Sequence, residues 1–106
     1  MKKKEFIDYL SSEKRFSVHT IASYTNDIEQ FSLFLSDNYQ ISNQVSDVSF
    51  QIVRSWIASL LEKGIAPRSV NRKISTLKTY FKFMIREGLL SESPMIKVVS
   101  PKSKKR

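Results

Sequence analysis

Residues 67–87 read PRSVNRKISTLKTYFKFMIRE, and this stretch decides the fold that the sequence predicts. Apolar residues recur in it at the three- and four-residue spacing of one helix face, namely Val70, Ile74, Leu77, Phe81 and Met84. Pro67 suits a first helical turn, where an amide hydrogen would have no partner in any case, and Gly88 follows as a stop signal. The pattern predicts a helix over residues 67–87 with one buried face.

The opposite face of this predicted helix is basic and rich in hydroxyl groups. At about 100° per residue it carries Arg68, Arg72, Ser75, Thr79, Lys82 and Arg86. Lys73 and Lys78 lie at the flanks, Ser69 and Thr76 add hydroxyls, and only Glu87 offers a negative charge. Helices that merely need solubility usually mix both signs in salt-bridging pairs. The face is therefore either an ordinary solvated surface or a surface for a polyanion such as duplex DNA.

Working toward the N-terminus, the same periodicity predicts three more helices, over residues 3–12, 18–38 and 50–63. Ser17 and Ser49 are suited to N-cap the second and third, and Gly64 stands where a left-handed C-terminal cap is needed. Residues 39–48 are rich in Ser, Asn and Gln and predict a loop that buries Ile41 and Val48.

The sequence as a whole predicts an all-α fold, a compact bundle of four main helices in one domain. Only two glycines and three prolines occur in 106 residues, which favours long helices over strands and turns. Ser93-Pro94 is a turn or helix-start signal and leaves open a short fifth helix near residues 94–99. The tail from Pro101 onward has no apolar residue and is expected to be disordered or a linker.

Positive charge is concentrated in the second part of the chain. Residues 1–62 carry six basic and eight acidic side chains, a net of −2, whereas residues 63–106 carry twelve and two, a net of +10. Such an asymmetry creates a local positive potential that attracts polyanions. Nucleic acid is the commonest partner of this kind, with anionic lipid and an acidic protein as alternatives.

Other classes of function find little support in the sequence. The chain has no cysteine and only one histidine, His19, so we expect no metal and no cofactor. His19 itself is more typical of a surface residue than of a catalytic one. It shows no signal-peptide pattern and no membrane-length apolar run, which predicts a cytoplasmic protein. Glycine-rich phosphate loops and Ser-His-Asp sets are also missing, so no catalytic residues are expected.

The predicted second helix also has two faces. Its apolar stripe runs from Ile21 to Leu35, and the outward positions are expected to be Thr20, Ser23, Asn26, Asp27 and Gln30. These polar groups suit contacts to phosphates and bases, and an ordinary wet surface explains them equally well. Tyr9, Tyr24 and Tyr80 are expected at the core or its boundary, with hydroxyls that reach a wet edge.

Two segments resemble the N-terminal, SAM-like core-binding domain of tyrosine recombinases and phage integrases. They are FSVHTIASYTNDIEQFSLFL at residues 16–35 and GIAPRSVNRKISTLKTYFKFMIREGLLSESPMIKVVSPK at residues 64–102. The second runs through a hydroxyl residue, an Arg, a Leu and two aromatics to a Gly and a closing Pro-Lys, with Ser93 where Asn before Pro is usual.

The resemblance implies a helical domain that grips one recombination half-site, with its second and fourth helices in the major groove of double-stranded DNA. It places Thr20 and Ser23 at the DNA on the second helix, and Arg68, Ser69, Arg72 and Lys73 on the fourth, with Arg68 and Arg72 as candidates for base contacts. From the polar faces described above, Asn26, Ser75, Thr76, Thr79 and Lys82 complete the candidate DNA-binding set.

The resemblance also implies partners for this chain. Residues 1–100 would form the DNA-binding domain and residues 101–106 the start of a linker to a catalytic domain, which in the family carries the residues for strand cleavage. That catalytic domain and other recombinase protomers in a synaptic complex would be its protein partners. The alternative is a helical protein-interaction or oligomerisation module, for which exposed apolar groups such as Phe34 would serve.

Overall fold

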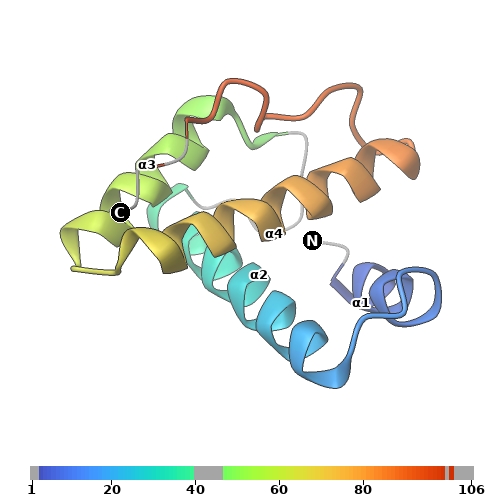
Figure 1. Cartoon of the computed structure of the whole chain (residues 1–106). Helices are drawn as coiled ribbons and strands as arrows, with labels where there is room; N and C mark the ends of the chain where they lie inside the picture. Colours follow the sequence, from blue (N-terminus) through green and yellow to red (C-terminus); the bar gives the residue numbers. More distant parts are fainter. Residues whose placement is uncertain (1–2, 40–46, 100, 102–106) are drawn as a thin grey trace. The chain divides into compact units, whose positions relative to one another are not determined.

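The computed structural model describes residues 3–39, 47–99 and 101. These residues form four α-helices and no strand. The helices are α1 (Lys3–Ser12), α2 (Val18–Tyr39), α3 (Phe50–Glu62) and α4 (Pro67–Arg86), labelled in Figure 1. The predicted all-α class and the four main helices are confirmed, with bounds within a residue or two of the expected ones. The chain divides into two compact units, Met1–Val45 with α1 and α2, and Ser46–Arg106 with α3 and α4.

The helix ends follow the capping signals in the sequence. The Ser17 hydroxyl accepts a hydrogen bond from the Thr20 amide at 3.2 Å, and the Ser49 hydroxyl accepts one from the Ile52 amide at 3.3 Å. Each bond satisfies one of the amides that a helix start leaves without a partner. At the other end of α3, Gly64 adopts the left-handed conformation expected of it, with φ 84°.

In the first unit, α1 packs against α2 through aromatic rings. The Phe6 ring centroid lies 6.3 Å from that of Tyr24, and the Phe16 ring lies 5.4 Å from the same Tyr24. Phe6 and Leu10 of α1 are buried, because they share the inner face of that helix. At the surface, the Lys3 ammonium and the Glu29 carboxylate form an ion pair of 2.7 Å that joins the two helices.

In the second unit, α3 packs against α4 (Figure 1). The predicted inner face of α4 is confirmed, since its five apolar residues are all buried: Val70, Ile74, Leu77, Phe81 and Met84. Val53 and Trp56 of α3 are buried as well. Burying a large apolar side chain contributes about 1.5–3 kcal/mol, so this face supplies much of the unit's stability.

Between residues 87 and 99, which the structure describes, the segment after α4 contains no fifth helix. Residues 94–97 form turns, because the Met95 amide is bonded to the Ser93 hydroxyl at 3.0 Å and the Val98 amide to the Met95 carbonyl at 3.1 Å. Val48 is buried as expected, whereas Ile41 lies outside the described residues. Within the described part of the chain, no helix has the length and apolar character to cross a membrane.

Candidate nucleic-acid interface

The outer face of α4 forms a line of exposed polar side chains. Arg68, Arg72, Ser75, Lys82 and Arg86 are exposed and Thr79 is half-buried, and we call these six residues the α4 strip. At about 100° per residue the six fall within roughly 80° of the helix circumference. At 1.5 Å rise per residue the strip is about 27 Å long. The six residues that the sequence places on the basic face of this helix therefore lie together on one narrow surface.

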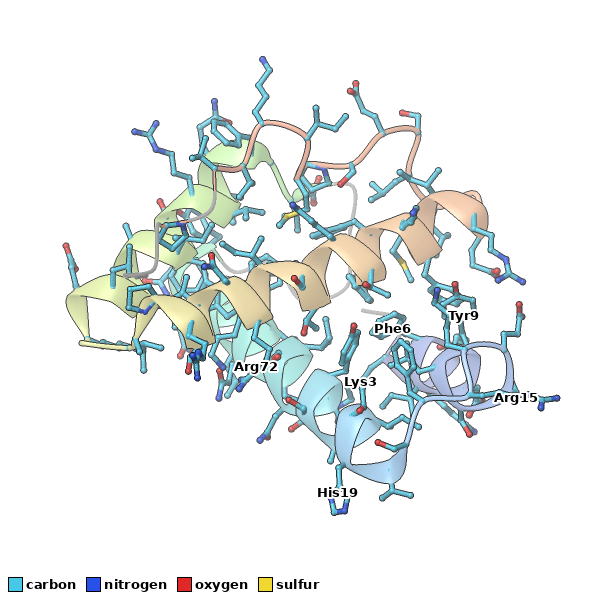
Figure 2. All side chains as sticks on the ribbon, viewed as in Figure 1. Lys3, Phe6, Tyr9, Arg15, His19 and Arg72 are labelled. Carbon is cyan, nitrogen blue, oxygen red and sulfur yellow. The ribbon has the colours of Figure 1, made fainter. Side chains whose placement is uncertain are left out.

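The α4 strip is electrostatically one-sided. No acidic residue occurs in α4 itself. The carboxylate of Glu87, which follows the helix, lies 3.9 Å from Nε of Arg86. Among the described residues, no ion pair joins Arg68 or Lys82 to a carboxylate. Figure 2 shows Arg72 extending from the first half of the helix. Positive charge spread along a line suits a partner whose negative charges also repeat along a line.

Four of the expected contact residues on α4 are not fully exposed, the half-buried Thr79 among them. Lys73 and Thr76 are buried, with exposed fractions of 6% and 1%, and Ser69 is half-buried. The Thr76 hydroxyl donates to the Arg72 carbonyl at 3.2 Å, as a threonine inside a helix commonly does. Lys73 was expected at the flank of the basic face and Thr76 among its hydroxyl groups, and both are instead buried. The physical reason is that α4 buries roughly half of its circumference, a wider arc than its apolar stripe predicts.

The expected contact residues on α2 lie in the other unit and are described on their own. Asn26 is exposed, and Thr20 and Ser23 are half-buried. The Thr20 hydroxyl accepts a bond of 3.0 Å from that of Ser17, so it is partly engaged in the cap of its own helix. No Lys or Arg occurs in α2, so this helix offers hydrogen-bonding groups rather than positive charge.

Asp27 and Tyr80 are more deeply buried than expected. Asp27, expected to face outward from α2, has an exposed fraction of 0%. Tyr80 is also at 0%, so its hydroxyl does not reach the wet edge predicted for it. Each of the two residues lies next to the apolar stripe of its own helix. At such a position, the burial of a side chain depends on what packs against the helix and not on the stripe alone. The half-buried Tyr9 and Tyr24 agree with the expected boundary position.

Sequence reasoning missed an exposed basic pair at the connection between α1 and α2. Lys14 and Arg15 follow the end of α1, and Arg15 adopts a left-handed conformation with φ 55°. Figure 2 shows Arg15 projecting from this turn, with His19 in the first turn of α2. The signal in the sequence was a pair of basic residues just before the N-cap residue Ser17.

The second unit also holds a hollow of about 610 Å³ beside its C-terminal segment. Its lining comes from the start of α3 and from residues 89–97, and includes Phe50, Leu90 and Pro94. Glu92 and Lys97 are its ionisable side chains.

Within the described residues, no group of three or more His, Cys, Asp or Glu side chains is placed to hold a metal ion. The α4 strip is therefore the most developed candidate site.

Residues 4–88 match the family described as "Phage integrase, N-terminal SAM-like domain". The chain belongs to this family, which confirms the fold class and the resemblance drawn from residues 16–35 and 64–102. The match covers α1 to α4 and therefore includes the whole α4 strip.

The chain is similar to curated proteins named tyrosine recombinase XerC. It is 40% identical over 101 residues to that of Bacillus pumilus (strain SAFR-032), covering 95% of this chain and 32% of the relative. It is 38% identical over 103 residues to that of Bacillus subtilis (strain 168), covering 97% and 33%. The chain thus spans about a third of the length of the curated relatives it matches. No solved structure gives a significant match to the chain.

Proposed function

We propose that this chain binds duplex DNA through the α4 strip, as the DNA-gripping domain of a tyrosine recombinase. The single observation that carries this proposal is the line of exposed cations and hydroxyls from Arg68 to Arg86, which no acid on α4 interrupts. Phosphate contacts from Lys and Arg supply most of the affinity of such surfaces. The family membership and the recombinase relatives support the choice of DNA over lipid or acidic protein.

In this proposal α4 lies in the major groove of the recombination half-site. The groove is about 12 Å wide and admits an α-helix. Arg68 and Arg72 lie one turn apart at the start of the strip and are assigned to base edges, and Ser75, Thr79 and Lys82 to phosphates. On α2, Thr20, Ser23 and Asn26 are assigned to further DNA contacts. The buried Lys73 and Thr76 are left out.

The proposal extends to the parent protein. Residues 1–100 form the DNA-binding domain, and residues 101–106 begin a linker to a catalytic domain. Strand cleavage and rejoining are assigned to the part of the XerC relatives that this chain does not match, about two thirds of their length. We assign this activity to the cytoplasm, as the sequence predicts.

A titration of labelled duplex DNA at several salt concentrations tests the proposal. Fluorescence anisotropy gives Kd, and the logarithm of the binding constant against the logarithm of salt gives a slope of about −0.9 per neutralised phosphate. We expect Lys82→Ala to make this slope shallower by about 0.9. Arg54→Ala, which removes an exposed cation from α3, is the control and should leave the slope unchanged. Binding that does not depend on salt contradicts the proposal.

The same titration separates base contacts from phosphate contacts. Duplexes are first selected from a random pool, and Kd is then compared on the selected and on scrambled sequences. Arg68→Ala is expected to cost about 1–3 kcal/mol on the selected duplex and less on the scrambled one. An equal loss on both duplexes would assign Arg68 to the backbone instead.

A second candidate function, a protein-interaction module, is favoured by the C-terminal segment rather than by Phe34. Phe34 is half-buried, with its ring 5.8 Å from that of Tyr39. Ile96 and Val99, however, are exposed by 70% and 83%. Exposed apolar side chains suit another protomer or the catalytic domain. Sedimentation of the isolated chain at low micromolar concentration tests this: self-association together with no binding to duplex DNA in dilute salt favours the interaction module.

A further inference from the structure

The turn between α1 and α2 holds its backbone in a conformation that arginine disfavours. Among the described residues, Arg15 is the only one besides glycine with a left-handed backbone, at φ 55°. In this conformation a Cβ atom lies too close to the following carbonyl oxygen, and glycine avoids that contact. Arg15 therefore costs stability that a glycine at the same position would not cost.

The residues on either side of Arg15 fix the conformation of this turn. The Phe16 amide bonds to the Leu10 carbonyl at 3.1 Å and closes the turn around Arg15. Leu10 is buried, and the Phe16 ring lies 5.4 Å from that of Tyr24. These contacts anchor the turn on the first unit, and the Arg15 side chain is left exposed at the surface, as Figure 2 shows.

Lys14 and Arg15 form an exposed pair of cations, which we call the basic turn. Among the residues that the structure describes, no ion pair joins either of them to a carboxylate. Lys3 of the same unit, by contrast, is held by Glu29 at 2.7 Å. An arginine that has no such ion pair and does not suit its backbone conformation is better explained by a contact outside the chain than by folding.

The basic turn lies directly before the residues of α2 that we propose to contact DNA. Two residues span at most about 7 Å, so the Cα atoms of Arg15 and Ser17 lie within that distance. The Ser17 hydroxyl in turn donates to that of Thr20 at 3.0 Å. α2 itself contains no Lys or Arg. Since phosphate neutralisation supplies most of the affinity for DNA, the basic turn provides the positive charge that α2 lacks.

We propose that the basic turn is a second contact surface for duplex DNA, in which Lys14 and Arg15 bind backbone phosphates. This inference rests on the proposed function and extends it from α4 to the first unit. A guanidinium group presents two parallel N–H groups that match the oxygens of a phosphate, so Arg15 binds in a bidentate manner. Phosphate contacts position a protein on DNA and carry no base preference. The stability lost at Arg15 is thus offset by affinity for DNA.

The test measures duplex binding by anisotropy between about 50 and 200 mM salt, together with thermal unfolding, for the unaltered chain and five variants. Arg15→Gly removes both the charge and the strain. Arg15→Asn removes the charge with a side chain that tolerates the left-handed conformation, and Arg15→Lys keeps the charge. Lys14→Ala removes the other cation of the turn, and Lys4→Ala, at an exposed lysine of α1, is the control.

We expect Arg15→Gly, Arg15→Asn and Lys14→Ala each to make the salt slope shallower by about 0.9. Across this roughly fourfold range of salt, the unaltered chain then loses about 3.5-fold more affinity than any of these three variants. Arg15→Lys and Lys4→Ala keep the slope of the unaltered chain. Arg15→Gly also raises the midpoint of thermal unfolding, so its weaker binding does not come from a folding defect.

Four results overturn the inference. If Arg15→Gly and Lys14→Ala keep the slope of the unaltered chain while Lys82→Ala makes it shallower, the basic turn is wrong and the proposed function stands. If Lys4→Ala changes the slope as much as Arg15→Gly does, the effect belongs to net charge and not to the turn. If Arg15→Asn keeps the slope and Arg15→Gly does not, the flexibility of glycine explains the loss. If the unaltered chain does not bind duplex DNA at low salt, the proposed function itself fails.

Discussion

At the scale of single residues, three helix ends depend on a left-handed backbone conformation. Gly64 and Gly88 have φ of 84° and 77°, and Arg15 has φ of 55°. At Gly88, the Leu89 amide bonds to the Met84 carbonyl at 2.9 Å, which spans six residues as in a Schellman motif. Two of the three positions hold the residue that this conformation favours, and Arg15 does not.

We predict opposite stability changes at Gly88 and Arg15. Gly88→Ala should lower the free energy of unfolding by about 1–2 kcal/mol, because a Cβ atom is unfavourable in this conformation. An added Cβ at Gly88 has no atom within 4 Å, so a steric clash contributes nothing. Arg15→Gly should raise the same free energy by up to about 1 kcal/mol, since relief of strain exceeds the entropy lost.

Urea unfolding followed by circular dichroism measures both changes. Glu87→Ala, at the exposed residue before Gly88, is the control and should stay within about 0.5 kcal/mol of the unaltered chain. If Gly88→Ala and Glu87→Ala both change the free energy of unfolding by the same small amount, the left-handed conformation at residue 88 does not disfavour a Cβ atom, and the prediction is wrong.

At the scale of elements, α4 separates two tasks by helical geometry. One half of its circumference is buried and stabilises the second unit, and the other half carries the α4 strip. Ser75 lies near the middle of the strip, between the pair of arginines and the pair formed by Lys82 and Arg86. A negative charge at Ser75 would therefore face the proposed phosphates without disturbing the buried half.

We predict that Ser75→Glu weakens duplex binding about tenfold, or about 1.4 kcal/mol, because a carboxylate repels the phosphates at the centre of the strip. Ser55→Glu is a matched control, since Ser55 is an exposed serine in the interior of α3. Anisotropy at constant salt measures both, with circular dichroism to show that each variant remains helical. Equal losses for the two variants would contradict the assignment of the site to α4.

The elements were predictable from the sequence because their signals are local. Periodicity, the caps Ser17 and Ser49, and the stop signal Gly88 all act within a few residues, and they placed the helix bounds closely. The burial of Lys73 and Thr76 could not be predicted in this way, because it depends on how much of α4 its surroundings cover.

At the scale of the whole molecule, two features go beyond local sequence patterns. They are the distribution of charge along the chain and the contacts between residues that are far apart in the sequence. The concentration of positive charge in residues 63–106 was visible in the sequence and pointed to the part that holds α4. The hydrogen bond from Nδ2 of Asn71 to the carbonyl oxygen of Pro101 was not visible, since it joins positions thirty residues apart with no motif between them. Family membership adds the recombinase context, which a basic helix alone could not supply.

The central claim is that the α4 strip is the surface that meets DNA, and an NMR titration tests it most directly. A chain of 12.3 kDa suits backbone amide spectra recorded with increasing amounts of a short duplex. We predict that the largest shifts fall on Arg68, Arg72, Ser75, Thr79 and Lys82, with smaller shifts at Thr20, Ser23 and Asn26. Shifts confined to Gln51, Arg54 and Ser55 on the exposed face of α3, with the α4 strip unchanged, would contradict the claim.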